Sequence, residues 1–143
     1  ADTPEFQLGQ LGAIIDDTNG TRMYKYLQYD TGSAGTAAVA GEVAYYYTLD
    51  GYKTFKVTSD LSDSVEIGAG VIQAVMTDGQ YGWFQVSGAA TLTIALTAGA
   101  DGDPLTPTGS ADGTLDVASA ATDNICAIAG DISDKEIICT FPL

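Results

Sequence analysis

Residues 79–96 read GQYGWFQVSGAATLTIAL and contain the only tryptophan of the 143-residue chain. From position 84 to position 96 every even residue is apolar or glycine, whereas the odd residues between them are mostly polar. A period of two predicts β-strands with one buried face. Tyr81 and Trp83 break the pattern, because these large rings stand on the polar face. We therefore expect both rings to be covered, either by another chain or by an N-terminal arm of the same chain.

Turn residues divide the rest of the chain into short segments. Tight turns favour Asn or Asp followed by Gly, since both residues tolerate a positive φ. Five such pairs occur, namely Asn19-Gly20, Asp50-Gly51, Asp78-Gly79, Asp101-Gly102 and Asp112-Gly113. Two of them predict hairpins, of residues 42–49 with 52–58 and of 70–77 with 80–87. Further strands are predicted at 22–29, 90–97, 124–129 and 136–142, shorter ones at 65–67 and 114–117, and one helical turn at 59–64.

These segments predict an all-β fold. About eight to ten short strands with Gly-rich turns are typical of a small β-barrel or β-sandwich, and the chain has the length of one domain. Residues 1–20 follow no strand alternation, so we expect an extended N-terminal arm ahead of a single domain at 21–143. The large apolar residues of this arm are Phe6, Leu8, Leu11, Ile14 and Ile15. An arm of this composition is predicted to pack on its own domain or on a neighbour.

The charge balance is strongly acidic. Nineteen Asp and Glu against five Lys and Arg, with no His, give a formal net charge of −14, and no base occurs from Val57 to Asp134. Such a surface repels phosphate, so we expect no binding to nucleic acid or to anionic membranes. No stretch approaches the roughly 18 consecutive apolar residues of a membrane span. The first residues also lack the basic and apolar regions of an intact signal peptide.

Two cysteines, Cys126 and Cys139, flank a predicted hairpin. A turn centred between Ile132 and Ser133 would place them opposite each other, so a cross-strand disulfide is one alternative. Buried free thiols in a protein assembled in cytoplasm are the favoured alternative. Two cysteines without any histidine provide too few ligands for a zinc site.

Residue types needed for several kinds of catalysis are missing. Without His, neither Ser-His-Asp nor Cys-His arrangements are available, and neither cysteine has a basic neighbour to activate it. A carboxylate pair stays as an alternative, although most acids lie in turns. Asp101 and Asp103 open a calcium-loop pattern with Asp112 at its twelfth position, and turn geometry explains them equally. We therefore predict no enzyme activity, no cofactor and no metal, with weak calcium binding near Asp101 and Asp103 left open.

The segment 42–49 is apolar on both faces. Val43 and Tyr45 share one face, and Ala44 and Tyr46 share the other. Strands of this kind are buried on both faces. In a domain of this size, such burial predicts a partner subunit or a covering arm, and Tyr and Trp are enriched in subunit interfaces. A cover made by the chain's own loops is the alternative.

Three stretches carry a resemblance to a known family. They read GVIQAVMTDGQYGWFQVSGAATLTI (70–94), GDPLTPTGSADGTL (102–115) and ICAIAGDISDKEIICTFPL (125–143). Their glycine spacing and alternation resemble the capsid decoration, or cement, proteins of tailed bacteriophages. The matching positions are Gly70, Ala74, Gly79, Gly82, Trp83, Gln85 and Gly88, followed by Gly102, Asp103 and Leu105. The chain departs from the pattern at CAIAGD (126–131), where many relatives have a Gly-Val/Ile-Ala segment.

The resemblance covers about residues 65–143 and implies a β-tulip-like protein on the outer surface of the virion capsid, assembled in the host cytoplasm. It implies binding across major capsid protein subunits, with the chain itself forming a homotrimer, to stabilise the expanded head. The candidate contact residues are Phe6, Leu8, Leu11, Tyr81 and Trp83. An extracellular bacterial adhesion module is the alternative function, and a carboxylate-dependent hydrolase is a less favoured one.

Overall fold

The computed structural model of the protein describes residues 1–18, 20–33, 35 and 37–143, so Asn19 of the first Asx-Gly pair lies outside the described residues. The described residues form ten strands, which confirms the all-β prediction. They are β1 Leu11–Asp16, β2 Gly20–Tyr29, β3 Val43–Tyr47, β4 Lys56–Thr58, β5 Ser64–Ile72, β6 Tyr81–Thr91, β7 Pro104–Thr106, β8 Asp116–Val117, β9 Ala127–Asp131 and β10 Glu136–Thr140. The helical turns are α1 Gly51–Thr54, η1 Leu61–Asp63 and η2 Ile132–Asp134.

Five of the strands close into a small barrel. The strands follow one another in the order β2, β4, β3, β5 and β6, and an additional antiparallel pairing of β6 with β2 completes the ring. That closing pairing runs from Met23 opposite Ser87 to Gln28 opposite Tyr81. The pairing of β2 with β4 is parallel, whereas β3, β5 and β6 pair antiparallel with their neighbours. The predicted small barrel is therefore present.

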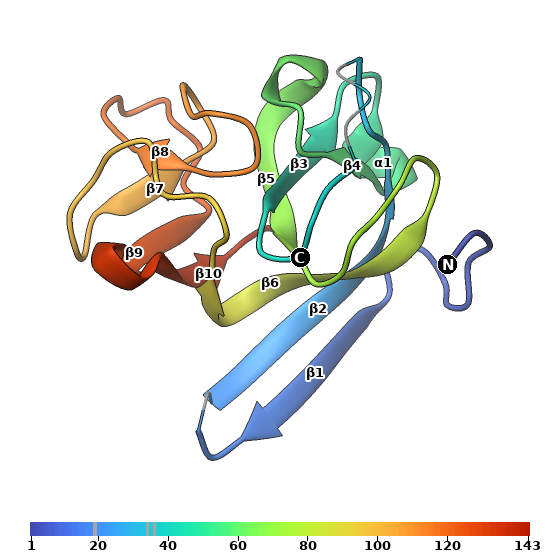
Figure 1. Cartoon of the computed structure of the whole chain (residues 1–143), viewed down its shortest axis with the longest axis horizontal. Coiled ribbons are helices and arrows are strands. Elements are labelled where there is room, and N and C mark those ends of the chain that lie inside the picture. The colour runs from blue at the N-terminus through green and yellow to red at the C-terminus, as the bar shows by residue number, and fades with distance from the viewer. Residues whose placement is uncertain (19, 34, 36) are drawn as a thin grey trace.

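The two longest strands extend beyond the barrel and carry the remaining strands. The first half of β2 pairs with β1, and the second half pairs with β4. The first half of β6 pairs with β5, and its second half pairs with β10. Beyond β10 the neighbouring strands of the sheet are β9, β7 and β8, in that order. Figure 1 shows the result: the β1–β2 hairpin projects from the barrel, and β7 to β10 form a lobe beside it.

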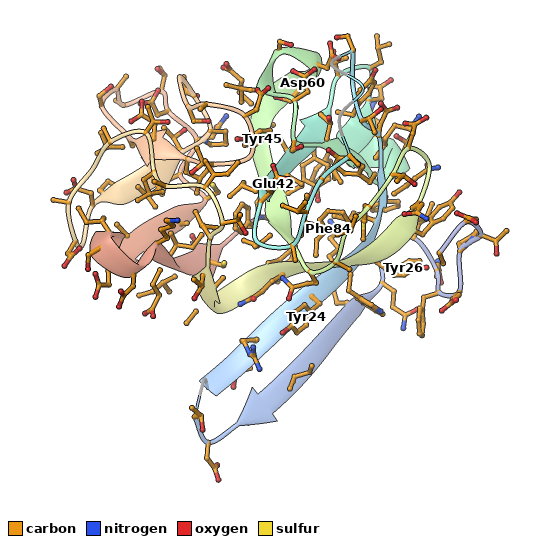
Figure 2. All side chains as sticks on the ribbon, viewed as in Figure 1. Tyr24, Tyr26, Glu42, Tyr45, Asp60 and Phe84 are labelled. Atoms are coloured by element: carbon orange, nitrogen blue, oxygen red, sulfur yellow. The ribbon has the colours of Figure 1, made fainter. Side chains whose placement is uncertain are left out.

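Two hydrophobic cores lie on opposite sides of β3. The barrel core consists of Leu27, Tyr29, Ala38, Ala44, Tyr46, Val57, Ala69, Ile72, Met76 and Phe84. The second core joins the barrel wall to the lobe and includes Val43, Tyr45, Val71, Val86, Leu105, Leu115, Ile137 and Phe141. Strand β3 is thus buried on both faces within one chain, with Tyr45 placed between barrel and lobe (Figure 2). Its double apolar character therefore gives no support to a partner subunit.

The apolar face predicted for the opening stretch is confirmed in β6, although Gln85 of the polar face is buried as well. Phe84 is fully buried in the barrel core, and Val86, Ala90 and Leu92 are buried in the second core. The predicted strand at 90–97 is wrong beyond Thr91, where β6 ends. The chain leaves the sheet there because the next amides bond elsewhere: the Leu92 N–H donates to the Lys135 carbonyl and the Thr93 N–H to the Gly41 carbonyl.

The two predicted hairpins form with longer connections than Asx-Gly turns would give. Strands β3 and β4 pair, but Asp50 and Gly51 lead into α1. Strands β5 and β6 pair only at Val71 and Ile72. The following residues leave the ladder because Met76 bridges to Ala38 on another loop. The pair Asp78-Gly79 still makes a turn, since the Gln80 N–H donates to the Thr77 carbonyl.

Candidate binding surface

The tryptophan lies in an aromatic cluster built from three segments of the chain. Trp83 on β6 has its ring centroid 5.1 Å from that of Phe6 and 5.2 Å from that of Tyr26 on β2. Phe6 also contacts Tyr26 edge-on at 5.3 Å, and Tyr81 stacks on Tyr26 at 6.4 Å. Aromatic pairs at such separations add about 0.5–1.5 kcal/mol each beyond the area they bury. Tyr26 lies beside the N-terminal segment in Figure 2.

The N-terminal residues supply the cover that the sequence analysis expected for the odd face of β6. The Tyr81 N–H donates to the Ala1 carbonyl at 2.8 Å, and the Ala1 ammonium donates back to the Tyr81 carbonyl at 2.9 Å. The Glu5 N–H donates to the Tyr26 hydroxyl at 3.1 Å. Residues 1–10 therefore pack on their own domain, and Tyr81 and Trp83 are half-buried.

The five predicted contact residues do not all meet. Phe6, Tyr81 and Trp83 belong to the aromatic cluster, and Phe6 is still 44% exposed. Leu11 is 42% exposed at the start of β1, where it pairs with Lys25. Leu8 is half-buried in the N-terminal segment, two residues after Phe6. An interface role for these five residues remains a prediction.

A prediction follows for the cover over the tryptophan. Replacing Phe6 by alanine removes the ring that packs on Trp83, so we expect a red-shifted emission and about twofold stronger acrylamide quenching. Because the chain holds one tryptophan, fluorescence reports on this site alone. The free energy of unfolding should fall by about 1 kcal/mol, since the ring is nearly half exposed. As a control, replacing the similarly exposed Val65 by alanine should leave the emission unchanged. Equal quenching of both variants would contradict the prediction that Phe6 covers Trp83.

The most exposed apolar surface near the cluster is the projecting hairpin, formed by β1 and residues 20–25 of β2. Ile14 is 51% exposed and Ile15 is 79% exposed. Adjacent residues of a strand point to opposite faces, so the hairpin presents an isoleucine on each face. Both isoleucines lie in the predicted N-terminal arm, but neither is among the five predicted contact residues. The run of two isoleucines before an Asx-Gly pair was the available signal.

A shallow apolar groove lies where the hairpin meets the barrel. Its volume is about 380 Å³, and it is lined by Gly12, Ala13, Ile14, Tyr24, Gln73 and Trp83. The absence of a side chain on Gly12 opens it, because a Cβ there would lie 3.5 Å from the Trp83 ring. The groove has room for one or two apolar side chains beside the tryptophan.

Strand β1 of the hairpin is also an edge strand of the sheet. Among the described strands β1 pairs only with β2, so one edge of β1 offers unpaired N–H and C=O groups. Exposed edges of this kind pair with strands of other chains unless charge or proline protects them. No Lys, Arg or Pro occurs in residues 11–16, and Asp16 is the only charged residue there. Edge, groove and exposed isoleucines together form a surface suited to a strand from another protein.

Acidic side chains such as Asp131 and Asp123 accept hydrogen bonds from the backbone of their own turns. Asp131 accepts from the backbone N–H groups of Ser133 and Asp134, and Asp123 accepts from those of Ser119 and Ala120. The Ser133 hydroxyl, which also donates to Asp131 at 2.6 Å, and then these N–H groups hold the pKa of Asp131 below its usual range. The N–H groups of Ala120 and Ser119 do the same for the pKa of Asp123. A carboxyl group that donates a proton in catalysis needs the opposite shift. Both side chains are thus explained by loop structure.

The calcium-loop pattern at Asp101 and Asp103, which the sequence leaves open as an alternative, has a similar explanation. Asp103 accepts from the Ala100 N–H at 2.9 Å, and Asp101 accepts from the Ile132 N–H at 3.0 Å. Within the described parts of the chain, no group of three or more His, Cys, Asp or Glu could hold a metal ion.

Both cysteines are buried and free. Cys139 pairs with Ala127, one residue away from the expected register with Cys126. Burial raises the pKa of the Cys139 thiol to about 12 and that of Cys126 further, so neither is an activated nucleophile.

Comparison of the chain with protein-family models, with curated proteins and with solved structures found no match in any of the three. The longest helical element of the described residues, α1, has four residues, and no helix there is long and apolar enough to cross a bilayer.

Proposed function

We propose that this protein is a virion structural protein that decorates the outside of a tailed-phage head. It binds across neighbouring major capsid protein subunits as a homotrimer and stabilises the expanded shell. The observation that carries the proposal is the projecting hairpin, which places Ile14 and Ile15 away from both cores beside an open strand edge. This feature supports a docking role more directly than a catalytic one.

The distribution of charge supports the same role. The stretch from Val57 to Asp134 supplies β5, β6 and the strands β7, β8 and β9 of the lobe, and it contains eleven acids and no base. The projecting hairpin carries little net charge, because its sequence has Arg22 against Asp16 and Asp17, and Lys25 at its base is buried. A nearly neutral apolar hairpin on an acidic body favours contact through the hairpin and discourages random association elsewhere.

The glycines of the phage-like run also fit close strand packing. Gly70 lies so near β6 that a Cβ would stand 2.9 Å from the Gln85 carbonyl oxygen. A Cβ on Gly82 would overlap the Met76 side chain, and one on Gly88 would stand 2.6 Å from the Thr21 carbonyl oxygen. The pattern that carries the resemblance therefore coincides with positions where neighbouring segments cross β6. It supports a shared fold, and the capsid role rests on the resemblance itself.

A double substitution in the hairpin tests the proposal. Changing Ile14 and Ile15 to threonine should weaken binding to expanded heads at least tenfold, because each buried isoleucine contributes about 1.5–3 kcal/mol to an interface. The free energy of unfolding should change by less than about 1 kcal/mol, since both side chains are largely exposed. Cosedimentation of purified protein with expanded heads lacking it measures the binding.

Two controls accompany the experiment. Ile138→Thr removes a similarly exposed isoleucine (45%) from β10 of the lobe and should bind heads normally. Compact proheads should bind neither form. Light scattering should give about three times the 14.7 kDa chain mass. A monomer that ignores expanded heads, or a double variant that binds as well as the parent, would overturn the proposal.

A further inference from the structure

A buried lysine occupies one end of the barrel interior. Lys25 on β2 is 4% exposed, and its Nζ donates to the hydroxyl of Tyr46 at 3.0 Å. The same Nζ lies 5.6 Å from the Tyr46 ring centroid and 5.4 Å from those of Tyr52 and Phe55. Three rings at this distance stabilise a cation through their π-faces.

The rings leave part of the ammonium without partners. An ammonium has three N–H donors, and the Tyr46 hydroxyl accepts one of them. No carboxylate of the described residues forms an ion pair with Lys25. Burial without a counter-ion lowers the pKa of Lys25. Buried charge of this kind is normally paired, so an anion that reaches Lys25 would gain a strong ionic contact.

A cavity gives access to the lysine. It has a volume of about 520 Å³ and is lined by Gly9, Leu11, Lys25, Tyr52, Lys53, Phe55 and Leu143. Leu11, Tyr52 and Leu143 are 42–56% exposed, whereas Lys25 is almost fully buried. The other walls are mainly apolar or aromatic.

The cavity also gathers positive charge in a chain that has little of it. Two of the four lysines line it, while the net charge of the chain is −14. The Lys53 ammonium is 3.8 Å from Asp50, but both side chains are more than 70% exposed, so this ion pair holds Lys53 weakly. The Lys53 ammonium can therefore turn away from Asp50 toward an anion bound in the cavity. The rest of the surface would repel such a ligand.

We propose that this cavity binds a small carboxylate that carries an apolar or aromatic body. The carboxylate accepts from the Lys25 ammonium and, at the mouth, from Lys53. The body packs on Phe55 and Leu11, which also line the cavity. A carboxylate fits better than a phosphate monoester, because Lys25 is the one buried ammonium of the site, and Lys53 is exposed and shares its charge with Asp50. The proposal is independent of the capsid role.

Lysine-selective NMR tests the site with benzoate as the probe. The chain has four lysines, at positions 25, 53, 56 and 135, so labelling the lysine ε-carbons gives four signals to assign. Benzoate should shift the Lys25 signal saturably and the Lys53 signal less. The Lys135 signal should stay unchanged, because this lysine bonds to the Thr93 carbonyl in the other part of the molecule.

A neutral ligand and two variants complete the experiment. Benzamide has the same shape without the charge and should cause less than a tenth of the Lys25 shift. Lys25→Met keeps the length of the side chain and should abolish the saturable shift at Lys53, whereas Lys53→Met should weaken benzoate binding about threefold and leave the protein folded. Equal effects of benzoate and benzamide, equal shifts at all four lysines, or undiminished binding by Lys25→Met would each overturn the proposal.

Discussion

Replacing Tyr45 by phenylalanine is expected to lower the free energy of unfolding by about 2–3 kcal/mol, although the ring stays in place. The hydroxyl of Tyr45 donates to the Thr114 carbonyl and accepts from the Thr114 N–H at 3.0 Å, and both residues are fully buried. Phenylalanine removes both hydrogen bonds, so the Thr114 N–H loses this acceptor, while the Thr114 carbonyl still accepts from the Ser110 hydroxyl at 3.2 Å. Buried groups that lose their partner carry the full cost of leaving water.

Thermal and urea unfolding measure this effect. A loss of about 2–3 kcal/mol corresponds to a fall in Tm of roughly 5–10 °C for a domain of this size. Tyr52→Phe is the matched control, because the same hydroxyl is removed from a side chain that is 48% exposed, and its Tm should stay within about 1 °C. If both variants melt together, Tyr45 does not hold the residue 110–114 loop on the core.

Replacing Gly88 by alanine is expected to lower the free energy of unfolding by about 3 kcal/mol. Gly88 has a φ of 91°, which costs about 1–3 kcal/mol in a residue with a side chain. A Cβ there would also stand 2.6 Å from the Thr21 carbonyl oxygen of β2. Because that neighbour is backbone, it yields only if β2 moves away from β6, which adds about 1–3 kcal/mol of overpacking.

Gly79 offers a matched control for the glycine substitution. Its φ is 81°, close to that of Gly88, but no atom lies within 4 Å of the position its Cβ would take. Gly79→Ala should therefore cost only the backbone strain, about 1 kcal/mol. The difference between the two variants in urea unfolding isolates the contact with β2. Equal destabilisation of both variants would show that β2 yields without cost at this point.

Local sequence patterns were sufficient for the fold class and for one face of β6. Period-two alternation predicts a buried face because neighbouring strand residues point to opposite sides, and Phe84 and Val86 bear this out. The pattern did not show where β6 ends, because Ile94 and Leu96 keep the alternation while the backbone bonds to loops. Hydrogen bonds between residues far apart in sequence decided that boundary.

The apolar character of β3 was interpreted correctly as double burial and wrongly as a sign of a partner. A sequence does not tell whether the second cover comes from another chain or from a distant part of the same one. Here the lobe covers Tyr45 and the barrel encloses Tyr46. The Lys25 site was beyond prediction for the same reason, since its three rings come from β3, α1 and the residue that follows α1.

The closing pairing of the barrel sets the order in which the chain can fold during synthesis. Residues 23–28 of β2 meet partners that lie 53 to 64 positions later. Pairings of such long range form slowly, because the intervening chain must lose its freedom first. A nascent chain that has not reached residue 87 leaves the Leu27 and Tyr29 side of β2 uncovered. The barrel therefore closes only when more than half of the protein has left the ribosome.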